Sequence, residues 1–268
     1  MSIGDAEIKT QERVIRFFKD PEILGYQYIG NLSDYQNKNI KEDRLRQYLR
    51  LKGYADKLID AAVMQLQQEA GNLSRGVYDA NKTVYSRLKY GIPVSESPEK
   101  PPVTVELIDE ANPLNNDFAI AEEVTVVEQQ EKRPDLVIYL NGIAVAVIEL
   151  KRSSISVSEG IRQNLTNQKD SFIRGFFTTM QFCMAGNESE GLRYGTLLTG
   201  EKFYMEWKDD GFKEHEEERD PVDVRISKTC EVIENKLLKQ IYAMFDKKRF
   251  IDLIMNFVVF DKGIKKVC

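Results

Sequence analysis

The chain has 268 residues, 42% of them hydrophobic and 30% charged, which is typical of a globular protein rather than a disordered or fibrous one. No apolar run approaches the roughly 20 residues of a membrane-spanning helix, and residues 1–5 do not begin a secretory signal. The net charge of -5 excludes little, because much of the acid lies in one segment, 209–223. We expect a cytoplasmic protein with no membrane partner.

Cysteine and histidine offer little for catalysis in this chain. Cys183, Cys230 and Cys268 are far apart and lack Cys-x-x-Cys spacing, so they predict neither a disulfide framework nor a zinc site. His215, the single histidine, lies in a run of glutamates that is typical of a solvated surface. A histidine-based mechanism is therefore not expected.

The first third of the chain is predicted to be helical. A helix over 7–20 ends before Pro21. Three further helical patterns, each followed closely by glycine, cover 41–52, 55–70 and 79–90. We assign 1–95 to a mainly helical N-terminal portion packed on the core.

Short β-prone runs begin at Val103. Strands are predicted over 103–108, 118–128, 135–140, 143–151, 179–184, 193–198 and 202–207, with one helix over 158–173. Asn141-Gly142 joins two of these strands in a hairpin. The pattern predicts an α/β fold with a mixed central sheet over 96–224.

Two helices, over 225–245 and 247–259, are predicted to close the chain. They make 225–268 a C-terminal portion that leads toward further structure, because the run 256–260 resembles the start of a new element. We therefore expect a longer parent protein. No Gly-x-x-x-x-Gly-Lys-Ser/Thr loop occurs, so a nucleotide-driven motor is expected only outside these residues.

The most informative pattern is Asp135 followed by Glu149 and Lys151 at the end of a strand that is otherwise apolar on both faces. Charges there require a partner or a metal. Mg²⁺ usually takes one or two carboxylates, so Asp135 and Glu149, with the carbonyl of Leu150, form a candidate site. Lys151 would orient or deprotonate the attacking water in phosphodiester hydrolysis.

The register of the hairpin decides whether this site forms. A strict two-residue Asn141-Gly142 turn pairs Asp135 with Ile148 and leaves Glu149 on the opposite face. A three-residue connection with a glycine bulge pairs Leu140 with Ala144 and Asp135 with Glu149, and it is the register that we predict. The alternative for the three charges is a salt-bridged cluster at a strand edge.

Several segments resemble known proteins. Pro134-Asp135 with Glu149-Leu150-Lys151 resembles the PD-(D/E)xK nuclease core. The surrounding sequence resembles the N-terminal region of type I restriction enzyme R (HsdR) subunits. The segments that resemble it are 116–118, 122–126, 133–135, 141–143, 149–152, 160–168, 184–187 and 191–195.

That resemblance implies a restriction-endonuclease-like core that cleaves double-stranded DNA with Mg²⁺. Asp135 and Glu149 would be metal ligands and Lys151 the catalytic lysine. It also implies an ATP-dependent DNA-translocating motor, absent here, and methylation and specificity subunits as partners.

The helix over 158–173 carries the DNA-binding candidates. Gln163 matches the glutamine of a family Gln-x-x-x-Tyr element, whereas Asn167 stands where tyrosine is expected. Arg162 and Lys169 would neutralise phosphates, or else form a solvated face.

Two further features carry weaker predictions. A second basic group lies at 247–249 and 262–266. Its charges either contact DNA or interact favourably with the dipoles of helix ends. For an acid from the first helix the candidate is Glu12, although its pattern favours an exposed glutamate.

Two rival interpretations remain open. One is a free-standing DNA repair nuclease with the same core. The other is a catalytically silent nuclease-fold docking module, which would tolerate replacement of Asp135, Glu149 and Lys151 by alanine.

Overall fold

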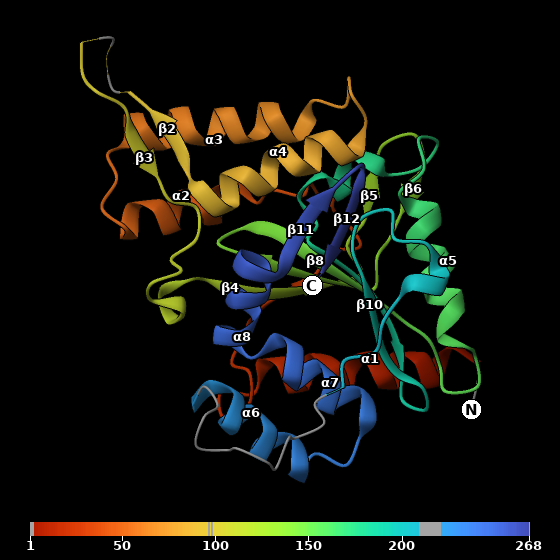
Figure 1. Ribbon diagram of the computed structural model, residues 1–268. Coiled ribbons are helices and arrows are strands. Elements are labelled where there is room, and N and C mark those ends of the chain that lie inside the picture. Colours follow the sequence, from red (N-terminus) through yellow and green to blue (C-terminus); the bar gives the residue numbers. More distant parts are fainter. Residues whose placement is uncertain (1–2, 96, 98, 209–220, 268) are drawn as a thin grey trace.

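A six-stranded sheet forms the centre of the protein (Figure 1). The computed structural model describes residues 3–95, 97, 99–208 and 221–267, so His215 lies outside the described residues. The strands lie in the order β1 (Gln27–Asn31), β4 (Phe118–Glu122), β7 (Leu136–Leu140), β8 (Ile143–Leu150), β9 (Phe182–Asn187) and β10 (Gly191–Gly195). β1 pairs in parallel with β4, as β8 does with β9, and the other neighbours are antiparallel. The predicted α/β fold with a mixed central sheet is confirmed.

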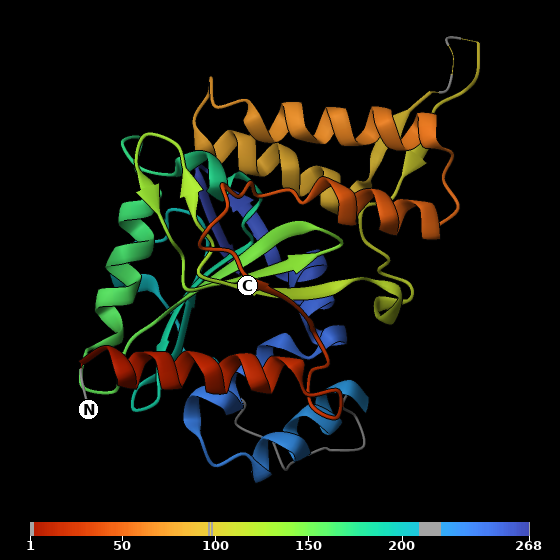
Figure 2. The same ribbon diagram turned by 180° about the vertical axis from the view of Figure 1, so that it is seen from behind.

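Both faces of the sheet are covered. The covering elements are α1 (Ile3–Lys19), α5 (Val157–Asn167), the short 3-10 helix η2 (Arg174–Thr179), α7 (Lys236–Phe245) and α8 (Lys247–Asp252). α1 runs below the central sheet in both views (Figures 1 and 2). Its Phe18 packs edge-on against Phe245 of α7. The opposite face holds Phe176 and Phe177 of η2 in a second buried cluster with Tyr139.

The predicted first helix is confirmed as α1, which begins four residues earlier than expected, and the next three predicted helices are confirmed to within two residues at each end. They are α2 (Glu42–Leu51), α3 (Asp56–Gly71) and α4 (Val77–Tyr90), which form a layer at the upper end of Figure 1. The predicted strand over 103–108 is shorter and lies outside the central sheet, because β3 (Val103–Val105) pairs only with β2 (Ile92–Val94). β1 was not predicted from the sequence.

The β7–β8 hairpin has a different geometry from the predicted one. Leu140 pairs with Ile143 across a two-residue turn, in which Asn141 and Gly142 have φ values of 52° and 81°. The predicted three-residue connection is therefore wrong. Asn-Gly favours the tight turn because both residues tolerate positive φ and the turn matches the strand twist.

A β-bulge lies further along the same hairpin. Tyr139 pairs with Ala144 and Ile138 with Ala146, so Val145 is an extra residue on β8. Beyond the bulge Leu136 pairs with Ile148, which brings the next residues, Asp135 and Glu149, opposite each other. A one-residue insertion moves all later side chains to the other face. The predicted pairing of Asp135 with Glu149 is thus correct, through a bulge at another position.

The segment after β8 departs from the prediction mainly at element ends. The predicted helix over 158–173 ends at Asn167 as α5, and η2 follows it. Instead of a strand over 202–207, the chain has a 3-10 helix, η3 (Glu201–Phe203), and a single bridge from Met205 to Tyr194. β5 (Val126–Val127) and β6 (Glu131–Lys132) form a separate two-stranded sheet.

The C-terminal portion is only partly helical. The predicted helix over 225–245 is divided into α6 (Pro221–Val232) and α7, because Asn235 caps α7 by accepting a hydrogen bond from Leu238 N. The predicted helix over 247–259 ends in a π-helical turn, Leu253–Phe257. A hairpin of β11 (Val258–Asp261) and β12 (Ile264–Val267) follows, so 225–268 is not a purely helical portion. In the described ranges, no helix is long and apolar enough to cross a membrane.

Candidate active site

Asp135 and Glu149 meet at the ends of β7 and β8. Asp135 Oδ2 accepts a 2.7 Å hydrogen bond from Leu150 N. The Glu149 side chain is fully buried, and its Oε2 accepts a 2.7 Å hydrogen bond from Gln163 Nε2. Its Oε1 is also buried and has no hydrogen-bond partner among the described residues. A buried carboxylate oxygen without a donor is costly, and either a bound cation or a proton shared with the Asp135 carboxyl would satisfy it.

The pKa values of both carboxyl groups are raised above their ordinary values. Burial raises the pKa of Asp135 from 3.8 to about 6, although Lys151 and the Leu150 N–H favour the charged form. Burial, followed by the charge of Asp135, holds the pKa of Glu149 well above its ordinary range. Burial and the mutual repulsion of the two carboxyl groups therefore favour their protonated forms, whereas a bound divalent cation would favour the ionised forms.

Lys151 directly follows Leu150, the last residue of β8. Its side chain is 15% exposed, and Nζ lies 3.0 Å from Leu150 O and 3.4 Å from Glu7 Oε1. Its N–H also donates to Gly186 O of β9 at 2.9 Å, which fixes the backbone after β8. The carbonyl of Leu150, the third predicted metal ligand, is therefore engaged by the Lys151 ammonium.

The first helix brings Glu7, not Glu12, to the site. Glu7 contacts Lys151, and Gln11, one turn later, donates to Glu122 Oε2 at 2.8 Å and Glu123 Oε1 at 3.1 Å. Glu12 is exposed, as its pattern favoured. A signal for Glu7 existed in the sequence, because positions 7, 11, 14 and 18 share one helix face and Val14 and Phe18 are buried.

α5 places Gln163 beside Glu149 through a close helix–strand contact. Ser156 caps the helix by accepting a hydrogen bond from Ser158 N. A Cβ on Gly160 would lie 2.9 Å from Ala185 Cβ and 3.4 Å from Glu149 Cβ, so only glycine allows this approach. Gln163, one turn later, then reaches Glu149. Asn167 is 2% exposed, which leaves it no surface for DNA.

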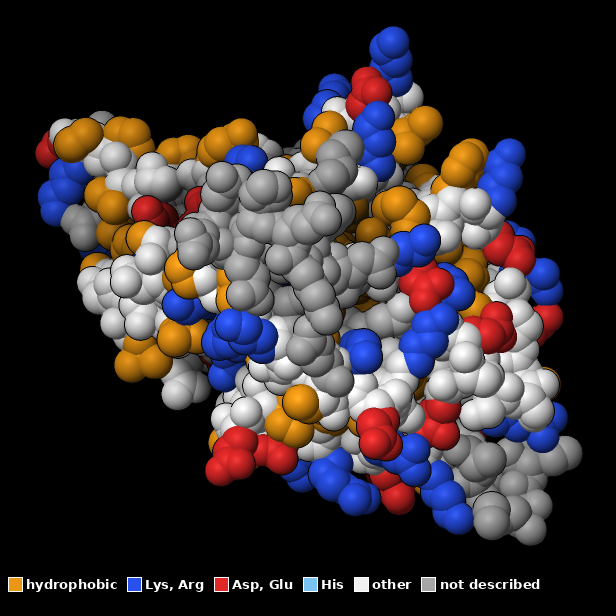
Figure 3. All heavy atoms as spheres, turned by 60° about the horizontal axis from the view of Figure 1, so that its bottom comes forward, with side chains coloured by type: hydrophobic (Ala, Val, Ile, Leu, Met, Phe, Trp, Pro, Cys, Tyr) orange, Lys and Arg blue, Asp and Glu red, His pale blue; other side chains and the backbone are white. Residues whose placement is uncertain are grey.

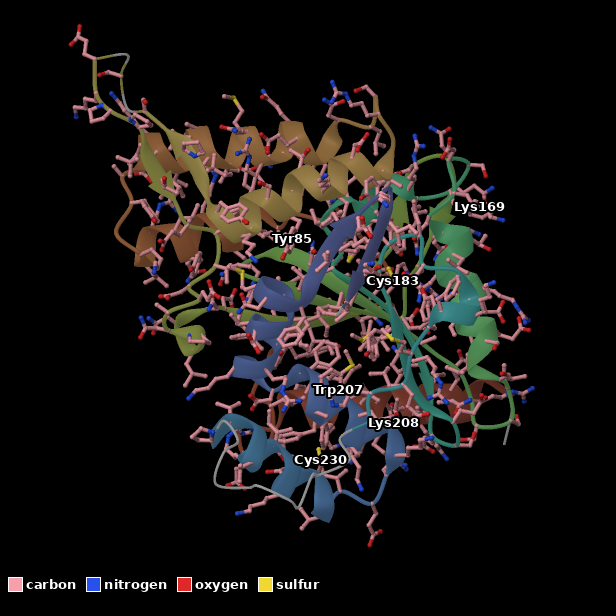
Figure 4. All side chains as sticks on the ribbon, viewed as in Figure 1. Tyr85, Lys169, Cys183, Trp207, Lys208 and Cys230 are labelled. Carbon is pink, nitrogen blue, oxygen red and sulfur yellow. The ribbon has the colours of Figure 1, made fainter. Side chains whose placement is uncertain are left out.

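The structure does not join Arg162 and Lys169 to this cluster by any contact among the described residues. Arg162 is 55% exposed and makes ion pairs with Glu201 at 2.9 Å and Glu159 at 2.8 Å. Lys169 is exposed just beyond the C-terminal end of α5, where Figure 4 labels it. Their predicted contact with DNA stays a prediction.

The second basic group is dispersed over the fold. Lys265 is 1% exposed, and Arg249 is buried with its guanidinium 5.2 Å from the ring of Trp207, labelled in Figure 4. Lys247 donates to Gly25 O at 2.9 Å. On the face seen in Figure 3, basic side chains are interspersed with acidic ones rather than joined in one strip.

A metal bound here would have few protein carboxylates. Within residues 3–95, 97, 99–208 and 221–267, no group of three or more His, Cys, Asp or Glu side chains is arranged to hold a metal ion. Asp135 and Glu149 thus remain the pair around which such a site would form. Mg²⁺ commonly keeps several waters, so a pair suffices for it.

Comparison with known proteins gives a family model and relatives that this chain matches. The family model described as the type I restriction enzyme R protein N terminus matches residues 7–203. A putative type I restriction enzyme endonuclease subunit from Methanocaldococcus jannaschii is 26% identical over 207 residues, covering 68% of this chain and 18% of that protein. A type I restriction enzyme endonuclease subunit from Staphylococcus saprophyticus is 29% identical over 112 residues, covering 40% of this chain and 12% of that protein.

The chain therefore spans less than a fifth of the length of the M. jannaschii relative in that match. The match to the family model includes α1 from Glu7 onward, the central sheet, α5 and the residues Asp135, Glu149, Lys151 and Gln163. With its restriction-endonuclease-like α/β fold, the chain belongs to the family of type I restriction enzyme R protein N-terminal regions.

Proposed function

We propose that this chain is the endonuclease part of a type I restriction enzyme R subunit and hydrolyses phosphodiester bonds of double-stranded DNA with Mg²⁺. The observation that carries the proposal is the buried Glu149 carboxylate beside Asp135, with Oε1 left without a donor. A merely structural salt-bridged cluster would be expected to satisfy both oxygens. Lys151 then has the role of catalytic lysine.

The residues present fit a divalent cation. Asp135 and Glu149 would hold it, and hard carboxylate oxygens are the ligands that Mg²⁺ prefers. The Leu150 carbonyl, which accepts a 3.0 Å hydrogen bond from Lys151 Nζ, has a second lone pair with which it would join them. When bound, Mg²⁺ lowers the pKa of a ligated water and stabilises charge on phosphate oxygens.

The protein's own groups orient the two carboxylates. The Leu150 N–H fixes Asp135 Oδ2, and the Gln163 amide fixes Glu149 Oε2. The remaining oxygen of Glu149 is free to accept a cation. Such hydrogen bonds to metal ligands set their orientation and their basicity.

Lys151 supplies positive charge at the same edge. Its ammonium lies 3.4 Å from Glu7 Oε1, so the acid on α1 directs the lysine toward the strand ends. From there the ammonium would orient the attacking water or stabilise the charge that develops on the phosphate.

In the full-length protein, we propose that cleavage is coupled to ATP-driven translocation by a motor outside these residues. Methylation and specificity subunits would be the other members of the complex, and the cytoplasm its location. The family assignment and the short share of the relative that the chain covers support this context.

Replacement of the three residues tests the nuclease proposal. Asp135→Asn, Glu149→Gln and Lys151→Ala are placed in the full-length subunit, which is assembled with its partners and assayed for DNA restriction. We expect the restriction activity of each variant to fall by about 100-fold or more. Glu12→Gln, an exposed acid on α1, is the matched control and is expected to retain it.

A second measurement separates metal binding from assembly. Thermal unfolding of this chain with and without Mg²⁺ should show stabilisation that Asp135→Asn and Glu149→Gln abolish. Full restriction by all three variants, with normal assembly, would instead establish a silent docking module.

A further inference from the structure

Arg133 and Glu123 form an ion pair at the margin of the candidate site. Arg133 Nε lies 2.6 Å from Glu123 Oε2, and their side chains are 57% and 23% exposed. Gln11 donates to the other oxygen of Glu123 at 3.1 Å. The acid is thus held from two sides, whereas more than half of the Arg133 side chain is exposed.

The backbone of Glu123 is held in an unusual conformation. Its φ of 50° lies in the left-handed region, which residues with a Cβ adopt only at a cost in free energy. Glu123 N donates to Asp135 O at 2.8 Å, and Val124 N donates to Pro134 O at 3.0 Å. Strained non-glycine residues often mark functional positions. Here the two backbone hydrogen bonds hold Glu123 in this conformation directly beside the Asp135 segment.

The cluster as a whole is acidic. Its acids are Glu7, Glu123, Asp135 and Glu149. DNA carries one negative charge per phosphate and would be repelled by such a cluster. Cationic side chains at the margin of the cluster are needed to bind the phosphates of the DNA backbone there.

We propose that Arg133 binds a phosphate of the DNA backbone next to the Asp135–Glu149 site and that Glu123 is the positioning residue that holds its guanidinium there before DNA arrives. This inference rests on the proposed function, since it takes DNA as the substrate. A guanidinium has five N–H donors, and the contact with Glu123 is made through the Nε edge. The two terminal nitrogens form the edge that suits bidentate contact with a phosphate.

DNA binding by this chain tests the role of Arg133. The dissociation constant for a short DNA duplex is measured by fluorescence anisotropy with Ca²⁺ over a series of salt concentrations. For Arg133→Gln we expect binding about tenfold weaker at low salt and a slope of log K against log salt reduced by about one. Arg133→Lys keeps the charge, so it should restore the slope and part of the affinity.

Arg50→Gln is the matched control. Arg50 lies on α2, is 56% exposed and pairs through Nε with Asp56 at 3.0 Å, but it lies in the helical layer rather than at the site. It should bind DNA as the unaltered chain does. Unchanged affinity and slope in Arg133→Gln, or no DNA binding by the unaltered chain at low salt, would overturn the inference.

A double-mutant cycle tests the role of Glu123. Glu123→Gln should change DNA affinity less when Arg133 is already glutamine, because Glu123 acts through the guanidinium. Purely additive effects would leave Glu123 with a structural role only. Asp135→Asn separates the two proposals, because it should abolish cleavage whatever Arg133 does.

Discussion

Gln163 donates a 2.7 Å hydrogen bond to Glu149 Oε2, while Glu149 Oε1 has no partner in the part of the chain that the structure describes. The two residues come from α5 and β8. Gln163 lies one turn after Gly160, where the helix packs closely on the sheet. The hydrogen bond gives Gln163 a local role that does not depend on contact with DNA.

We expect Gln163→Ala to weaken Mn²⁺ binding and DNA cleavage by about tenfold or more, because ligand-orienting hydrogen bonds commonly have effects of this size. Isothermal titration calorimetry of this chain measures the first effect, and restriction by the assembled enzyme the second. Arg162→Ala, next to Gln163 but paired with Glu201 and Glu159, is the control for metal affinity. Equal Mn²⁺ affinity in the Gln163 variant would show that the hydrogen bond does not orient the ligand.

The pairing of Asp135 with Glu149 was predictable, but the bulge that produces it was not. Hydrophobic alternation and Asn141-Gly142 predict the hairpin. The position of the extra residue depends on contacts from distant segments. Gln181 N donates to Val145 O at 2.7 Å, and Asn39 O accepts from Ala144 N at 2.8 Å. No pattern local to 135–151 contains that information.

The remaining misses have similarly physical causes. Glu12 and Glu7 are both glutamates on one helix, and only the helix phase relative to the buried stripe distinguishes them. The predicted helix over 247–259 extends into Val258 and Val259, but β-branched residues before Lys262-Gly263 favour the observed hairpin.

Asp135 also predicts a pH dependence. Its pKa rises from 3.8 unfolded to about 6 folded, so the group contributes stability below about pH 4 that is lost as the pH rises through about 6. Glu149, whose pKa is also raised by burial, adds loss in the same direction. Without divalent cations, the contribution of this pair to the free energy of unfolding therefore falls from pH 4 upward.

Mg²⁺ should reverse this loss, because only the ionised carboxylates bind it. The difference in Tm between Mg²⁺ and EDTA should therefore widen from pH 5 to pH 8. Thermal unfolding followed by circular dichroism checks it, with Asp135→Asn as the control that flattens the trend. A gap in Tm that is the same at all pH values would contradict the prediction.

Gly142 tests how tightly the hairpin turn is held. A Cβ at this position would lie 2.7 Å from both Leu45 N and Lys41 O, in a residue with φ of 81°. Gly142→Ala should lower the free energy of unfolding by about 2 kcal/mol or more, because strain and a backbone clash combine. Gly263 is the matched control, since its φ is 82° and nothing lies within 4 Å of its Cβ position. Chemical denaturation of both variants should show the larger loss for Gly142→Ala, and equal losses would remove the steric part of the argument.

Gly160 connects helix packing to the candidate site. Glycine in a helix is ordinarily less stable than alanine by roughly 0.5–1 kcal/mol. At Gly160 the sign should reverse, because an added Cβ would lie 2.9 Å from Ala185 Cβ and force α5 away from β9. Gly160→Ala should therefore lower Tm and weaken Mn²⁺ binding, since Gln163 moves with the helix. Ala185→Gly in the same chain removes the atom that the new methyl group meets, so the double variant should recover much of the Mn²⁺ affinity. If Gly160→Ala stabilises the protein instead, α5 can accommodate a methyl group at this position. That result would contradict the inference that the packing of Gly160 positions Gln163.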